Sequence, residues 1–118
     1  MNAANAHANA ALGTAGGTPL ILASLKENPE SVQTLLRAPN IDVNVVTEDG
    51  MTALFEASTQ GNLGVVRALL DAPHIDVNAA NEDGWTPLIC AAGLGHLEVV
   101  RALLNRSDAD ANAREEIQ

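Results

Sequence analysis

The sequence repeats itself at an interval of 34 residues, and this period constrains the fold more than any other feature. The motif Thr-x-Leu occurs at residues 18–20, 52–54 and 86–88. Paired leucines occur at 35–36, 69–70 and 103–104, and a motif that begins with aspartate and ends with asparagine occurs at 42–44, 76–78 and 110–112. A fixed internal period of this length indicates a repeat fold.

Each unit carries the signals of two short helices. A threonine stands at the start of each first helix as an N-cap, and in two of the units proline follows it at the first helical position. We expect these helices to end near Lys26, Gln60 and Leu94. Gly61 and Gly95 follow two of the ends and can supply the left-handed conformation that closes a helix.

The first unit has Glu27 where the other units have glycine. A left-handed conformation at this residue would cost on the order of 1 kcal/mol, so we expect the turn of the first unit to differ. The next residues are favourable, because Asn28 can cap a helix, Pro29 fits the first helical position and Glu30 complements the helix dipole. The second helix is therefore expected to begin normally.

The second helix of each unit has apolar residues at helical spacing. They are Leu63, Val66, Leu69 and Leu70 in the middle unit, and Leu97, Val100, Leu103 and Leu104 in the last. This spacing places them on one face of a helix. Helices this short are marginal in isolation, so their stability must come from stacking between neighbouring units.

Polar segments join the units at residues 38–51 and 72–85. Pro39 and Pro73 end the preceding helix, and an Asp-Gly pair marks a tight turn in each segment. We expect each segment to project as a β-turn finger.

These features resemble the ankyrin repeat, whose pattern runs Asp-Gly-x-Thr-Pro-Leu-His-x-Ala-Ala, then Gly-His-x-x-Val-Val-x-x-Leu-Leu, then a loop ending in Asp-Val-Asn. Residues 83–112 read DGWTPLICAAGLGHLEVVRALLNRSDADAN and match that pattern. The resemblance implies an all-α solenoid of stacked helix-turn-helix units with β-turn fingers, over residues 16–118, with units at about 16–49, 50–83 and 84–118. Residues 1–15 are expected to be a disordered leader or the worn tail of an earlier repeat.

The sequence departs from the family pattern in two respects. The histidine of Thr-Pro-Leu-His is replaced by Ile21, Phe55 and Ile89, so an apolar contact is expected in place of the family's hydrogen-bond bridge. Each finger loop also carries one residue more than the usual unit, in the stretch Ala-Pro-x-Ile. Tetratricopeptide repeats share the period but need aromatic positions, and aromatic residues make up only 2% of this chain.

Charge and cysteine content narrow the possible partners and location. The net charge of −9 disfavours nucleic acid and anionic membranes, and it suits a partner protein with a basic or amphipathic segment, although it could serve solubility alone. Cys90 is the single cysteine, so no intrachain disulfide forms and an intracellular location, cytoplasmic or nuclear, is expected. No signal peptide or membrane span is indicated.

No set of residues predicts an active site, a metal site or a cofactor. His7, His74 and His96 have no credible nucleophile beside them, and His96 is expected to be a satisfied capping residue. Cys90 is expected to be a small packed thiol. We therefore expect no enzyme, no cofactor and no metal.

The residues that stand out lie on the expected fingers and at the ends of the first helices. Met51 and Trp85 place large apolar side chains directly after the turn glycine, and a lone tryptophan there is an expected interface anchor. It could instead pack against its own neighbouring finger. The predicted partner-binding residues are Glu48, Asp49, Met51, Thr59, Gln60, Glu82, Asp83, Trp85 and Leu94.

The expected function is non-catalytic binding of a partner protein through the concave face formed by the fingers and first helices. The alternative is a structural or regulatory fragment of a larger multidomain protein, or a chain that associates with itself through its end repeats, whose helices keep the full apolar pattern. A monomer is favoured.

A further resemblance concerns two asparagines of the repeat loops. Asparagines at this position of ankyrin repeats can be substrates of an asparaginyl hydroxylase that favours a leucine eight residues earlier. Leu36 with Asn44, and Leu70 with Asn78, have that spacing. The alternative is that Asn44 and Asn78 only form hydrogen bonds with the finger backbone.

Overall fold

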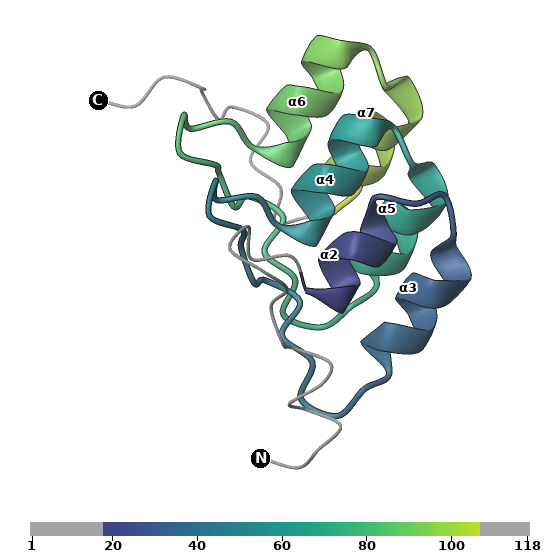
Figure 1. The fold of residues 1–118 in the computed structure, drawn as a ribbon. Helices are drawn as coiled ribbons and strands as arrows, with labels where there is room; N and C mark the ends of the chain where they lie inside the picture. Colours follow the sequence, from purple (N-terminus) through teal and green to yellow (C-terminus); the bar gives the residue numbers. More distant parts are fainter. Residues whose placement is uncertain (1–17, 107–118) are drawn as a thin grey trace.

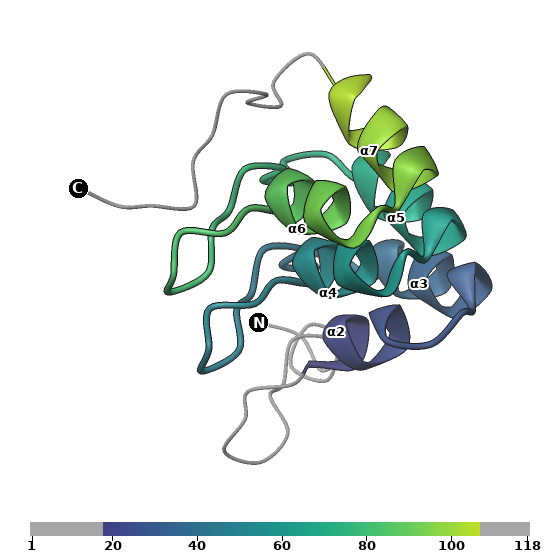
Figure 2. The ribbon, with the colours of Figure 1, turned by 90° about the horizontal axis from the view of Figure 1, so that it is seen from above.

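The computed structural model describes residues 18–106, and within them the chain forms three pairs of short helices (Figure 1). They are α2 (Pro19–Ser24), α3 (Pro29–Leu36), α4 (Ala53–Gln60), α5 (Leu63–Leu70), α6 (Pro87–Leu94) and α7 (Leu97–Leu104). The first helices of the pairs form an inner layer and the second helices an outer layer, with the finger loops projecting beside the inner layer (Figure 2). The predictions for residues 1–15, and for the end of the last unit beyond residue 106, lie outside the described residues.

Threonine capping starts all three inner helices as predicted. The backbone N–H groups of Ile21, Phe55 and Ile89 donate to the hydroxyls of the threonines three residues earlier, at 3.3, 3.0 and 3.2 Å. These threonines are Thr18, Thr52 and Thr86, all of them buried. The helix starts are therefore fixed by short-range hydrogen bonds that recur at the repeat interval.

The ends of the inner helices differ between units. Gly61 and Gly95 close α4 and α6 with φ angles of 71° and 79°, as predicted. The expectation that the first helix reaches Lys26 was wrong, because α2 ends at Ser24 and its cap residue Leu25 is right-handed. Glu27 has no positive φ angle, so the chain avoids the cost of a left-handed side-chain residue by ending the helix earlier.

The outer helices supply a large part of the core. Val65, Val66 and Leu69 of α5 are fully buried, because α3 and α7 pack on either side of this helix. Asn28 caps α3 through a hydrogen bond from the Ser31 N–H, which confirms the favourable start predicted for that helix. Stacking of the outer helices, together with the inner helices and the returning loops, thus forms the continuous core on which the short elements depend.

Replacement of the family's histidine produces apolar packing in the inner layer. Ile21 and Phe55 are 3% and 4% exposed, and they belong to the buried apolar residues of the molecule. Ile89 is partly buried at the equivalent position of the last unit. The predicted apolar contact is therefore present where the hydrogen-bond bridge would otherwise lie.

The extra residue of each repeat loop adopts a left-handed conformation. Asn40 and His74 occupy the variable position of the Ala-Pro-x-Ile stretch and have φ angles of 57° and 66°. After this turn Ile75 is 4% exposed, so the loop returns to the core. The additional residue changes the local path of the loop while the helices remain stacked, as predicted.

Polar side chains also connect one unit to the next. The Asn44 side chain donates to the His74 carbonyl at 2.8 Å and accepts from the Asp76 N–H at 2.8 Å. Asn62 donates to the Lys26 carbonyl at 2.7 Å. These bonds satisfy loop backbone groups across the unit boundaries and fix the register of stacking.

His96 forms the corresponding contact between the last two units. Its Nε2 atom lies 3.0 Å from the Thr59 carbonyl oxygen, which can only accept, so the imidazole donates from this nitrogen. The prediction that His96 acts as a capping residue was wrong in mechanism, because its side chain makes no capping hydrogen bond at the start of α7. The ring is satisfied by the preceding unit instead.

Gly61 and Gly95 have similar backbone conformations but different surroundings, which gives a matched test of stacking. An added Cβ at Gly61 would lie 2.6 Å from His96 Nδ1, whereas one at Gly95 would meet nothing within 4 Å. Gly95→Ala should lower the free energy of unfolding by about 1–2 kcal/mol through backbone strain. Gly61→Ala should cost about 1–2 kcal/mol more, because the His96 ring must move. Urea unfolding of both variants measures the difference, and equal losses would contradict the contact.

Candidate protein-binding surface

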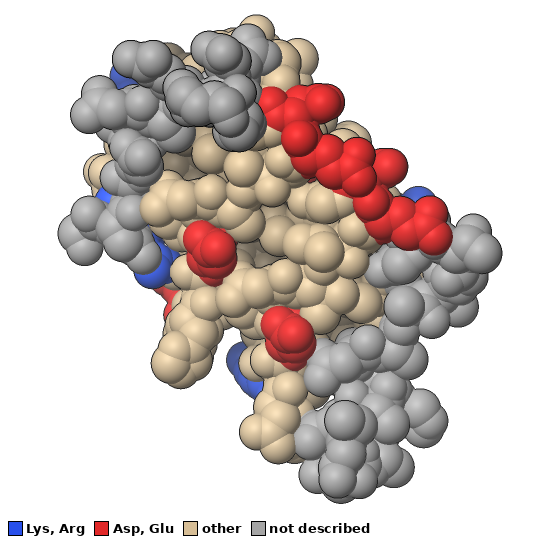
Figure 3. Space-filling model, turned by 90° about the vertical axis from the view of Figure 1, so that its left-hand side faces the viewer, with Lys and Arg blue, Asp and Glu red and all other residues tan. Residues whose placement is uncertain are grey.

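Four carboxylates form an acidic row on successive finger tips. Glu48, Asp49, Glu82 and Asp83 are all exposed, and the row crosses the finger side of the molecule in red, where few blue side chains are visible (Figure 3). We call the surface made by these tips and the inner helices the finger face. Neither finger hairpin, residues 45–51 or 79–85, contains lysine or arginine. Stacking therefore aligns like charges instead of pairing them.

Local hydrogen bonds hold each hairpin tip in place. The Thr47 N–H donates to the Met51 carbonyl at 3.0 Å, and the Asn81 N–H donates to the Trp85 carbonyl at 2.9 Å. Gly50 and Gly84 take φ angles of 80° and 85°, which lets the chain reverse after the two acidic residues. Both pairs of carboxylates are thereby carried on closed turns with the same hydrogen-bond pattern.

Met51 and Trp85 lie at the base of the hairpins and not on their tips. The Trp85 N–H donates to Asn81 Oδ1 at 3.0 Å, and the residue directly precedes the threonine cap of α6. Both side chains are half-buried. Closing the hairpin draws the residue after the glycine back toward the inner helix. The role of Trp85 as an interface anchor stays a prediction.

The ends of the inner helices contribute polar and apolar groups to the finger face. Gln60 is exposed at the end of α4, and Leu94 at the end of α6 is 57% exposed. Thr59 is half-buried, and its hydroxyl donates to the Phe55 carbonyl at 2.9 Å. Of these three predicted residues, Leu94 offers the largest unburied apolar side chain.

Glu56 is a further acidic residue that the sequence reasoning missed. It lies on α4, where burial is the first cause of a raised pKa and the charge of Asp49 is the second. This interaction places Glu56 close to the acidic row, at the position that Leu22 and Cys90 occupy in the neighbouring units. Comparing the equivalent positions of the three units could have revealed Glu56, because the first and third units have the uncharged residues Leu22 and Cys90 there.

Cys90 has the environment of a packed thiol. It is 7% exposed, and burial raises the pKa of its thiol, although a hydrogen bond with Thr59 opposes that shift. A raised pKa leaves less of the nucleophilic thiolate at neutral pH. This confirms the predicted packing role.

Metal binding finds no support among residues 18–106, since they contain no group of three or more His, Cys, Asp or Glu side chains arranged to hold an ion. Within the same residues, no helix is long and apolar enough to cross a membrane. The functional groups that the fold does bring together are the acidic row, the hairpin-base residues Met51 and Trp85, and the ends of the inner helices.

Comparison with known families identifies the class of protein. The profile of ankyrin repeats in three copies matches residues 20–115. The chain therefore belongs to the ankyrin repeat family, whose members are generally protein–protein interaction modules and whose fold is non-enzymatic. No match was found among curated proteins.

The raised pKa of Glu56 predicts how the stability of the protein depends on pH. A carboxyl group whose pKa is raised on folding stabilises the fold below its unfolded pKa and loses that contribution as pH rises through the folded pKa. Glu56→Gln should therefore raise stability relative to the parent at pH 7, and the gain should shrink on acidification below about pH 4. Urea unfolding at both pH values measures this.

Asp49→Asn supplies the matched arm of that experiment. It removes the second cause of the Glu56 pKa shift and leaves the first, so it should reproduce part of the neutral-pH gain. A Glu56→Gln variant that is less stable than the parent at pH 7 would contradict the assignment.

Hydroxylation of Asn44 and Asn78 stays a prediction. In the structure the Asn44 side chain already bridges to the next loop through the His74 carbonyl and the Asp76 N–H. Intact-mass measurement on protein from its native cells should show the mass of one oxygen atom per modified asparagine, and Asn44→Ala should remove one such addition. An intact mass without added oxygen would contradict the hypothesis.

Proposed function

We propose that the finger face binds a partner protein that presents a basic or amphipathic segment. The observation that carries this proposal is the row of exposed carboxylates on neighbouring hairpins that contain no basic residue. A cationic segment crossing the two tips would meet four carboxylates at successive positions: Glu48, Asp49, Glu82 and Asp83. Electrostatic complementarity of this kind gives orientation and a fast association rate.

Apolar groups beside the row would supply the rest of the affinity. Met51 and Trp85 lie at the bases of the same hairpins, half-buried and held by hairpin hydrogen bonds. Because Met51 and Trp85 are already restrained, a partner side chain that packs on them would cost little of their side-chain entropy. Leu94 extends the apolar surface at the end of α6.

Glu56 on α4, near Asp49, adds to the acidic character of the site. Its raised pKa reports burial and the nearby charge of Asp49, both of which an approaching cation would offset. Binding of a basic segment should thus relieve a repulsion built into the free protein. An intracellular location, cytoplasmic or nuclear, belongs to the same proposal.

A second candidate function is self-association through the last unit. Leu97 and Leu104 of α7 are 56% and 48% exposed, whereas Leu70, the counterpart of Leu104 on α5, is 8% exposed under the next unit. This apolar end surface supports a role as a structural or regulatory part of a larger assembly. Sedimentation of the purified chain separates the candidates, because the finger-face proposal is compatible with a monomer and self-association is not.

The finger-face proposal is tested by two changes on that face. Affinity capture with the parent chain first identifies partners, and each is then titrated by calorimetry. Trp85→Ala should weaken binding by about tenfold or more, as truncation of an interface anchor does. Glu82→Lys with Asp83→Lys should slow association and reduce its dependence on salt.

The control for these variants is Glu30→Lys, which reverses an exposed charge in the first turn of the outer helix α3. It should leave binding unchanged. If every captured partner binds the Trp85 and finger-tip variants as tightly as the parent, the assigned face is wrong.

A further inference from the structure

The outer side of the molecule contains two grooves that are related by the repeat. The first, of about 540 Å³, lies between α3, α5 and the loops after them, and we call it the first outer groove. The second, of about 360 Å³, lies between α5 and α7. Leu36, Ala68 and Ala72 line the first, and their counterparts one repeat later line the second, namely Leu70, Ala102 and Arg106.

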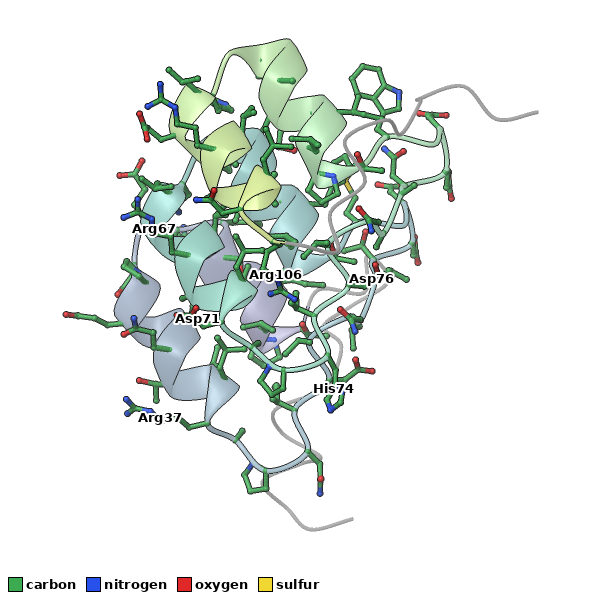
Figure 4. All side chains as sticks on the ribbon, turned by 180° about the vertical axis from the view of Figure 1, so that it is seen from behind. Arg37, Arg67, Asp71, His74, Asp76 and Arg106 are labelled. Atoms are coloured by element: carbon green, nitrogen blue, oxygen red, sulfur yellow. The ribbon has the colours of Figure 1, made fainter. Side chains whose placement is uncertain are left out.

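Four lining positions differ between the grooves, namely Gln33 and Arg67, Arg37 and Asp71, Asp71 and Asn105, and Ala72 and Arg106. The last of them changes the side chain that reaches from one unit to the next. Arg106 follows α7, and its guanidinium donates a hydrogen bond to the carbonyl of Leu70, the last residue of α5. Asp71 and Arg106, both labelled in Figure 4, line the second groove together. The equivalent residue of the middle unit is Ala72, whose methyl group has no hydrogen-bond donor for the Leu36 carbonyl at the end of α3. The first groove lacks the side chain that the second one contains.

The linings agree with this difference. The first outer groove reaches down to the finger loop, where Ile41, Val43 and Asn44 form part of its wall. The lining of the second groove includes Arg106 and, among residues 18–106, none of the counterparts Ile75, Val77 and Asn78. The larger cavity is the one in which alanine stands at the position of Arg106.

The groups around the first outer groove suit a guanidinium. Asp42 and Asp71 contribute two carboxylates, and the carboxyl end of α3 contributes the negative end of a helix dipole. Arg37 also belongs to the lining, but it is exposed and its side chain lies on the far side from His74 (Figure 4). Leu36 and Ala68 offer apolar contact to the methylenes of a long side chain.

We propose that the first outer groove receives an arginine side chain of a partner protein, which takes the place that Arg106 fills in the next repeat. A planar guanidinium donates in several directions at once and is weakly hydrated, so it fits a site of carbonyl and carboxylate acceptors better than an ammonium does. This site lies on the outer helices, and it is independent of the finger-face proposal.

The test uses N-acetyl-argininamide as the probe and amide NMR spectra of the full chain as the readout. A ligand of this size should bind with a Kd on the order of 1 mM and shift the signals of Leu36, Ala68 and Ala72 in a saturable way. The citrulline analogue has nearly the same shape without the charge, and it should bind at least about tenfold more weakly.

Two variants at one position separate charge from volume. Ala72→Arg should fill the groove from within, as Arg106 fills the next, and should abolish the probe-induced shifts while raising the melting temperature. Ala72→Met fills a similar volume without a donor, and it should block the probe but raise the melting temperature less. Both variants keep the finger face, so their binding there should match the parent.

Three results from the binding measurements would overturn the proposal. They are the absence of saturable shifts in the parent at tens of millimolar probe, shifts confined to the acidic finger tips, and unchanged probe binding by Ala72→Arg. An equal rise in melting temperature for the methionine and arginine variants would also overturn it, because filling of an apolar cavity would then explain the effect.

Discussion

Stacking of helix pairs is the interaction on which the rest of this structure depends. Each helix has only six or eight residues, a length that is marginal in water without tertiary contacts. Val65, Val66 and Leu69 are completely buried because α5 has an outer helix on each side. In the last described helix, Leu104 remains 48% exposed although its sequence context matches that of Leu70. The same paired-leucine pattern therefore contributes more to the free energy of folding where a neighbouring unit covers it.

Stacking also determines the electrostatics of the finger face. Because equivalent positions lie above one another, the Glu-Asp pair that precedes each turn glycine becomes a continuous acidic row. Hydrogen bonds across unit boundaries, such as those of Asn44 and His96, keep the units in register and so keep the carboxylates aligned. The raised pKa of Glu56 is one consequence, since the fold buries this side chain near the charge of Asp49.

Differences between equivalent residues give the regular scaffold its individual sites. Glu27 shortens the first inner helix, whereas glycine at the same position allows the other two to continue to their full length. Ala72 leaves a groove open where Arg106 reaches the end of the preceding outer helix. The helices remain stacked in pairs around these substitutions. The chemistry of an ankyrin array can therefore vary while its core remains the same.

The sequence by itself determined the period, the threonine caps, the closing glycines and the ankyrin class, because these depend on local backbone preferences and short-range hydrogen bonds. Only the tertiary structure decided that Trp85 is half-buried at a hairpin base, that His96 bonds to Thr59, and that Glu56 joins the acidic row. Each of these depends on a second segment that packs against the residue, often one repeat away. Sequence spacing identifies equivalent residues, whereas burial and hydrogen-bond partners follow from how adjacent units meet.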